Sequence, residues 1–176
     1  MQLVSLDRAL ANPSANALQF LPTTIFSAIL HNTLSLGFDP QDLITCGADC
    51  ISPFYHPSTA QDDPAALLAS ATLRLPAGTP EHLRPSLTQI VVPHHPSFDL
   101  IPLPQLRDRA IMLSAAMPDI FNLWELKLDI YQRGGLSVRR QSQPWDKSSW
   151  VAAPWFLAKW SMIVAEEREH LSEGVC

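Results

Sequence analysis

The chain has 176 residues, of which 12 are Lys or Arg and 17 are Asp or Glu, so its formal net charge is −5. Only 16% of the residues are charged and 47% are hydrophobic, whereas charged residues make up about 25% of an average soluble domain. This composition excludes a disordered chain and predicts a single domain with its own core. It also argues against direct nucleic-acid binding, which requires clustered Lys and Arg to neutralise phosphates.

Neither a membrane-spanning nor a secretory segment is expected. The longest stretch without a charged residue covers 9–38, but Asn12, Gln19 and Asn32 are among the polar residues that interrupt it. No run of about 20 predominantly apolar residues is present, and the N-terminus lacks a basic region followed by an apolar core. We therefore predict an intracellular protein, cytoplasmic or nuclear, that does not associate with membranes.

The chain contains three cysteines, Cys46, Cys50 and Cys176, and an odd number cannot pair fully within one molecule. Because reduced thiols are the default inside cells, we expect small buried cysteines without disulfides. Cys46 and Cys50 together with His56 are a candidate set of metal ligands, but the cysteine spacing differs from that of common zinc sites. No metal and no cofactor are predicted.

Apolar periodicity and helix-start residues predict a mainly α fold. The expected helices cover 23–36, a short segment after Pro40, 64–73, 104–117, 119–132 and 154–169. Asp63 and Pro64 are a typical start, because a short polar side chain caps the first turn and proline fits its first position. The helix over 119–132 is expected to bury a stripe formed by Ile120, Trp124, Leu128 and Tyr131.

Prolines are concentrated in the middle of the chain, where ten of the 16 lie between Pro53 and Pro104. Proline removes a backbone donor and favours extended conformations in the residue before it. We therefore expect an ordered, extended connector over a helical core, with a possible short strand at 87–92. The predicted organisation is an N-terminal extension, a single compact helical domain and a C-terminal tail, covering 1–19, 20–170 and 171–176.

The densest group of chemically active side chains is His94, His95 and Asp99. Imidazoles titrate near neutral pH and a carboxylate can orient them, so these three residues are the candidate catalytic residues for acid–base chemistry. The alternative is structural: Asp99 caps a turn and a buried histidine bonds to backbone carbonyls. His94 and His95 do not form one metal site in an extended chain, because adjacent side chains point to opposite sides.

Four of the five tryptophans recur every fifth residue near the C-terminus. This spacing does not align them on one helix face, which leaves two interpretations. The rings either lock the last helix onto the core, or they line an apolar pocket in which indole N–H groups orient a ligand. The candidate ligand-binding residues are Arg107, Trp124, Trp145, Trp150, Trp155 and Trp160.

Three blocks of residues, taken in order, resemble one known family. The N-terminal block includes Leu30–Asn32 and Ser52–Phe54, the middle block Pro93–Pro96, Asp99 and Leu106–Asp108, and the C-terminal block Pro144–Asp146 and Pro154–Trp160. Together they resemble a fungal domain of unknown function that commonly follows the basic-region leucine zipper (bZIP) in fungal transcription factors. The resemblance spans roughly residues 20–165.

The chain departs from the pattern of that family at several places. Ser97 stands where the family often has an aromatic residue, and 137–140 replaces an apolar-Trp-Gly turn. Residues 1–19 contain one Arg, no Lys and no heptad repeat, although a leucine zipper needs apolar positions sustained over several heptads. The sequence is therefore interpreted as a stand-alone copy of the domain without the bZIP segment.

The resemblance implies a regulatory module linked to transcription, which would bind a hydrophobic small molecule or a protein partner and would not contact DNA directly. The alternative is a cofactor-independent enzyme of fungal secondary metabolism, of the cyclase, isomerase, dehydratase or hydrolase type. Such an enzyme would use an aromatic-lined pocket with the His and Asp side chains as acid–base groups. The residue pattern fits both and does not specify an oligomeric state.

Overall fold

The computed structural model describes residues 25–47, 49–140 and 142–172. Its helices are α1 (25–35), α2 (Pro40–Thr45), α3 (Pro64–Leu73), α4 (Leu87–Val91), α5 (Pro104–Ala116), α6 (Leu123–Tyr131), α7 (Pro154–Lys159), α8 (Ser161–Val164) and α9 (Arg168–Ser172). Short 3-10 turns are η1 (Glu81–Leu83), η2 (Pro96–Phe98) and η3 (Lys147–Ser149), and the strands are β1 (Leu136–Val138) and β2 (Trp150–Ala152). The mainly α prediction is confirmed.

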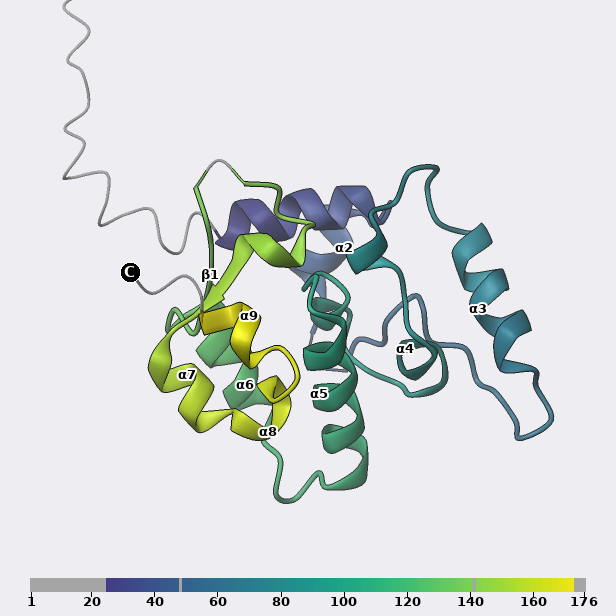
Figure 1. The fold of residues 1–176 in the computed structure, drawn as a ribbon. Coiled ribbons are helices and arrows are strands. Elements are labelled where there is room, and N and C mark those ends of the chain that lie inside the picture. The colour runs from purple at the N-terminus through teal and green to yellow at the C-terminus, as the bar shows by residue number, and fades with distance from the viewer. Residues whose placement is uncertain (1–24, 48, 141, 173–176) are drawn as a thin grey trace, which may run out of the picture.

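Helix α5 runs through the middle of the molecule (Figure 1), and it contacts α4 and α8. Helices α6 to α9 gather beside it, α1 lies across one end, and α3 stands out on the far side, where it packs against α4. In the part of the chain that the structure describes, no helix is both long and apolar enough to cross a bilayer.

Most helices begin where the sequence predicts, because the starting signals are local. Asp39 caps α2 and Asp63 caps α3, each by accepting a hydrogen bond from a backbone amide two residues later, and each is followed by proline. Helix α3 covers the predicted range 64–73 without change. The N-terminal extension predicted at 1–19 lies outside the described residues.

Three predicted elements differ from the structure. The segment 87–92 is not a strand, because a capping box between Ser86 and Gln89 starts helix α4 there. Helix α6 begins at Leu123, where Asn122 caps it, so Ile120 lies before the helix and is 82% exposed instead of buried. The long C-terminal helix is broken into α7, α8 and α9: the backbone leaves the helical conformation at Trp160, between α7 and α8, and a turn over 165–167 separates α8 from α9.

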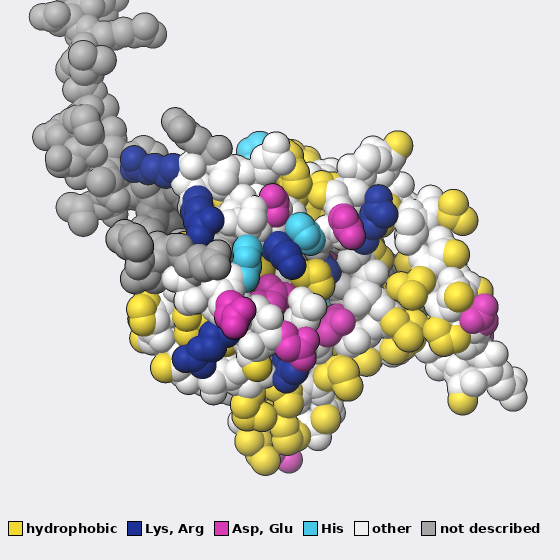
Figure 2. All heavy atoms as spheres, in the orientation of Figure 1, with side chains coloured by type: hydrophobic (Ala, Val, Ile, Leu, Met, Phe, Trp, Pro, Cys, Tyr) yellow, Lys and Arg dark blue, Asp and Glu magenta, His cyan; other side chains and the backbone are white. Residues whose placement is uncertain are grey.

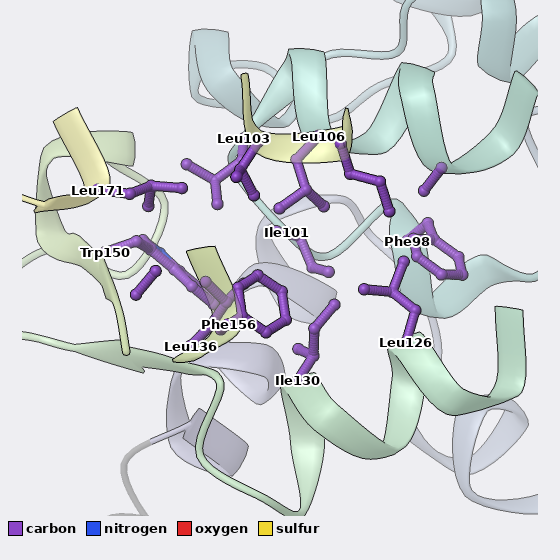
Figure 3. Packing of buried hydrophobic residues seen from close by; sticks show 14 of the residues in the cluster. Phe98, Ile101, Leu103, Leu106, Leu126, Ile130, Leu136, Trp150, Phe156 and Leu171 are labelled. Atoms are coloured by element: carbon purple, nitrogen blue, oxygen red, sulfur yellow. The ribbon is translucent and has the colours of Figure 1, made fainter. Parts of the chain in front are cut away.

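The main core lies between α5, α6, α7 and the small sheet. Its fully buried side chains include Phe98, Ile101, Leu106, Leu126, Ile130, Trp150 and Phe156 (Figure 3). Strands β1 and β2 are antiparallel and pair Leu136 with Ala152. Leu171, assigned from the sequence to the C-terminal tail, is fully buried in this core.

The proline-rich middle is more folded than the expected extended connector, since η1, α4 and η2 all lie within it. It is nevertheless ordered, as predicted, because its separate stretches bond to one another. The Ser52 amide donates to the His94 carbonyl at 2.7 Å, and the His56 amide donates to the Ile90 carbonyl at 2.8 Å. A second core cluster, formed by Leu36, Phe54, Leu83 and Leu100, joins this middle segment to α1.

Candidate functional site

His94 and Asp99, two of the three predicted catalytic residues, meet in a closed polar cluster. The Nε2 atom of His94 lies 2.8 Å from Oδ1 of Asp99, and neither side chain is exposed to solvent. Asp99 also accepts hydrogen bonds from the Ser52 hydroxyl at 2.6 Å and from the Gln89 side-chain amide at 2.6 Å. The carboxylate thereby joins Ser52, 47 residues away, to Gln89 and His94, which lie within ten residues of it.

The hydrogen-bond partners define where the proton of this pair lies. Nδ1 of His94 is 2.8 Å from the carbonyl oxygen of Val92, and because a carbonyl only accepts, Nδ1 carries a hydrogen. Nε2 and Oδ1 of Asp99 would repel each other if both were unprotonated. One proton is therefore held between His94 and Asp99, in a site sealed from water.

Arg107, a predicted ligand-binding residue, is buried rather than open to a ligand. Its guanidinium donates to the backbone carbonyls of Asp99 and Arg84, and its Nε atom has no hydrogen-bond partner. Burial lowers the pKa of Arg107, while the carboxylates of Asp99, Asp108 and Glu167 oppose that shift. The side chain therefore ties η2 to the loop before α4 from within α5.

The predicted tryptophans do not converge on one pocket. Trp150 lies in the main core and donates its indole N–H to the Pro144 carbonyl at 2.8 Å, whereas Trp145 packs on the second core cluster. Trp124 and Trp155 are 60% and 41% exposed at different places. That the tryptophans bind a ligand stays a prediction. The packing of Trp150 and Trp145 agrees with the interpretation that the rings lock the core.

Trp160 belongs to a charged cluster that sequence reasoning missed, centred on Asp129. The nearly buried Asp129 carboxylate binds Arg133 at 2.8 Å, Lys159 at 2.7 Å and the indole N–H of Trp160 at 2.8 Å. Burial alone would raise the pKa of Asp129, but these hydrogen bonds outweigh burial and hold it below the usual range. Only the spacing of Asp129 and Arg133, four residues apart on α6, was visible in the sequence.

A partly open pocket of about 410 Å³ lies where α1 and α2 meet the proline-rich middle. Its wall is mostly apolar, and its charged lining residues are Asp39 and Asp42. The lining residues are Gly37, Phe38, Asp39, Asp42, Leu43, Cys46, Cys50, Ile51, Pro53 and Pro96. Phe38 is held in the wall by a tilted ring contact with Phe54, at 5.3 Å between centroids.

Cys46 and Cys50 in this wall are joined by a disulfide, with their Cα atoms 5.7 Å apart. The expectation of reduced thiols is therefore wrong for this pair, because the end of α2 and the following turn bring the two residues into the range that a disulfide requires. The sulfur of Cys46 lies 3.7 Å from Nε2 of His95. Within the described residues, no group of three or more His, Cys, Asp or Glu is placed to hold a metal ion.

His95 does not share the contacts of its neighbour His94. It contacts Cys46, which lines the pocket. Burial lowers its pKa, and the positive charge of Lys127 lowers it further, while a backbone hydrogen bond with Gly47 opposes the change. Lys127 is itself half-buried, and burial lowers its pKa. The Lys127 ammonium also lies 5.5 Å from the centroid of the Trp124 ring. No motif in the sequence pointed to this lysine.

A second, more open pocket of about 520 Å³ lies at the turn between α5 and α6. Its lining residues are Ser114, Pro118, Asp119, Phe121, Asn122 and Leu123. Hydrophobic side chains gather at this end of the molecule (Figure 2), where Ile120 is exposed. None of the predicted catalytic residues lines this pocket, and of the lining of the first pocket only Pro96 lies within their segment.

The fold and its site define a small, mainly α domain with a sealed polar cluster and a partly open apolar pocket. Its family is the domain of unknown function DUF3425, whose pattern matches residues 70–171. The chain belongs to this family, which confirms the resemblance; the middle and C-terminal blocks lie within the matched residues, whereas the N-terminal block lies before them. No curated protein and no solved structure matches the chain significantly.

Proposed function

We propose that this domain is a regulatory module that binds an apolar small molecule carrying a positive charge. The pocket between α2 and the proline-rich middle carries the proposal. Its volume of about 410 Å³ falls in the range of about 300–1,000 Å³ that small-molecule sites occupy. Phe38, Leu43 and Ile51 supply the apolar surface that such a ligand would cover.

The charge of the ligand follows from the lining of the pocket. Asp39 and Asp42 are both exposed, and no Lys or Arg is among the lining residues. An anionic ligand would be repelled here, whereas an amine would be attracted, most strongly at low salt. The preferred ligand is therefore a hydrophobic amine.

A regulatory role is favoured over the enzymatic alternative by the position of the acid–base pair. The proton between His94 and Asp99 is enclosed by protein, and these two residues do not line the pocket. A base must come within hydrogen-bond reach of the proton that it abstracts. The family resemblance to a domain that accompanies bZIP segments supports a role beside transcription factors.

Ligand binding can be tested with fluorescent dyes and a matched pair of variants. Ile51 lines the pocket and is 57% exposed, whereas Ile44 is 77% exposed on α2 outside the pocket. Ile51→Ser should weaken binding of the cationic dye thioflavin T by about tenfold, since it removes apolar contact area. Ile44→Ser should bind the dye as the wild type does. Equal affinities of both variants, or no saturable binding by the wild type, would refute the proposal.

The charge preference has its own test. Asp42→Asn should weaken thioflavin T and strengthen the anionic dye anilinonaphthalene sulfonate, and added salt should reduce both changes. Asp119→Asn, at the second pocket, is the matched control and should alter neither dye. If Asp42→Asn shifted both dyes in the same direction, the pocket would not select by charge.

A further inference from the structure

We propose that the Cys46–Cys50 disulfide is a site of thiol–disulfide exchange with small thiols, in which Cys50 forms the mixed disulfide and Cys46 is the leaving group. This activity goes beyond ligand binding and does not depend on it. A chain that bound no hydrophobic amine could still exchange thiols at this bond.

The disulfide is open to attack from the pocket. Cys46 and Cys50 are both partly exposed, and both line the cavity of about 410 Å³. The cavity provides room for a small thiol beside the two cysteines, and access of the attacking thiol is one of the factors that govern thiol–disulfide exchange. Access distinguishes this bond from a structural disulfide closed inside a core.

The two sulfurs are not equivalent. Among the contacts of the described residues, His95 contacts the sulfur of Cys46 and not that of Cys50. The backbone N–H of Ser97 donates to Nδ1 of His95 at 3.1 Å, so the lone pair of Nδ1 is occupied. The neutral ring therefore carries its hydrogen on Nε2, and Nε2 lies 3.7 Å from the sulfur of Cys46.

Burial and the charge of Lys127 keep this tautomer neutral. Both lower the pKa of His95, with burial the larger cause, against a backbone hydrogen bond with Gly47 and the charge of Asp99. The Nε2–H group is the one donor of this ring; it lies beside the sulfur of Cys46, and the backbone of Gly47 also engages it. A donor there stabilises a thiolate on Cys46, and a more stable leaving thiolate departs faster.

The exchange balances with two molecules of thiol. A thiolate RS⁻ attacks the sulfur of Cys50, the S–S bond breaks, and its electron pair goes to Cys46, which faces the Nε2–H of His95. A second thiolate then attacks the sulfur of R in the mixed disulfide and releases the Cys50 thiolate together with RSSR. The protein disulfide gains two electrons and two protons, and two RSH are oxidised to RSSR.

The pocket also selects among thiols. Because Asp39 and Asp42 are its charged lining residues, a cationic aminothiol such as cysteamine should react faster than the anionic mercaptoacetate. Each rate is divided by the rate of the same thiol with a small reference disulfide, which removes differences in intrinsic nucleophilicity. The corrected preference should be several-fold and should shrink in high salt.

The test uses the full chain with Cys176→Ser, so that the remaining thiols are those of the proposed site. The folded, oxidised protein is mixed with cysteamine, quenched with acid and mapped by peptide mass spectrometry. The adduct should lie on Cys50. An adduct mainly on Cys46 or spread equally, or failure of the folded chain to form the Cys46–Cys50 bond under mild oxidation, would overturn the proposal.

A pair of histidine variants tests the role of His95. His95→Asn retains a side-chain acceptor for the Ser97 amide but removes the donor to Cys46, and it should slow the exchange by about tenfold, the worth of one hydrogen bond to a charged sulfur. His31→Asn, at an exposed position of α1, should react at the parent rate. With circular dichroism showing an intact fold, an unchanged rate in His95→Asn would refute the assignment of Cys46 as the assisted leaving group.

Discussion

His94 and Asp99 hold a single proton between them: Nε2 and Oδ1 are 2.8 Å apart, and both side chains are closed off from solvent. The carboxylate also receives hydrogen bonds from Ser52 and Gln89, so it fastens the loop at Ser52 to helix α4 and to the segment of His94. Buried polar groups of this kind stabilise a fold only while every donor keeps its acceptor.

Removing the Asp99 carboxylate should therefore be among the most destabilising single changes. Asp99→Ala leaves three buried donors without an acceptor, and the expected loss is about 3–5 kcal/mol in the free energy of unfolding. Ser52→Ala removes one of these donors and should cost only about 1–2 kcal/mol. Urea denaturation measures both.

The matched control for these variants is Glu169→Ala, at an exposed carboxylate. It should change the free energy of unfolding by less than about 0.5 kcal/mol. If Asp99→Ala were no more destabilised than Glu169→Ala, the cluster would not hold the segments together.

Gly135 should not tolerate a side chain, for a purely steric reason. A Cβ atom there would collide with the ring of Phe156 and would lie 2.6 Å from the backbone oxygen of Asp129. We expect Gly135→Ala to lower the free energy of unfolding by about 2–3 kcal/mol, as overpacking does. Gly47→Ala, whose Cβ would meet nothing within 4 Å, should be neutral or slightly stabilising in the same thermal melts. Similar melting temperatures for the two variants would contradict this packing.

Glu167 should make stability fall as the pH rises. Its carboxylate accepts a hydrogen bond from the Gln105 amide at 3.0 Å, in the first turn of α5, but burial raises its pKa, while that hydrogen bond and the charge of Lys147 oppose the shift. The folded state therefore retains the proton to a higher pH than the unfolded chain. The stabilisation that protonated Glu167 gives the folded state is fully present below the ordinary glutamate pKa of 4.5. It is lost as the pH rises through the pKa of Glu167 in the folded state.

The variant Glu167→Gln does not titrate and isolates this effect. Its free energy of unfolding, measured relative to that of the wild type, should increase as the pH is raised from about 4 to about 7. Urea titrations of both proteins across this range give the difference directly, because the other groups titrate alike in both. A difference that stays constant with pH would show that Glu167 keeps its ordinary pKa.

His95 should titrate below the usual histidine range, and Lys127 should be part of the reason. Burial is the larger cause and the Lys127 charge the second. Lys127→Met should therefore raise the NMR titration midpoint of the His95 imidazole without bringing it up to 6.5. Lys147→Met is the control and should leave the His95 midpoint in place. A midpoint unaffected by Lys127→Met would mean that the two side chains do not interact.

The N-terminal starts of the helices were readable from the sequence because they depend on residues only a few positions apart. Asp63 and Pro64 define the start of α3, and the structure retains the predicted range. The family resemblance was equally local, since it rested on short blocks in a fixed order. Errors arose where two local signals competed: the apolar run at 87–92 suggested a strand, but the Ser86–Gln89 capping box made it a helix.

The contacts of the candidate site could not be predicted from the sequence, because the partners of several of them are distant and carry no local signal. His94 and His95 are adjacent and identical in type, yet one is sealed against Asp99 and the other faces Cys46, 49 residues away. The sequence by itself determined a mainly α domain of a recognisable family, since local capping and apolar spacing decide helices. Only tertiary packing decided the pocket, the disulfide and the roles of the histidines, because burial and long-range neighbours govern which groups meet.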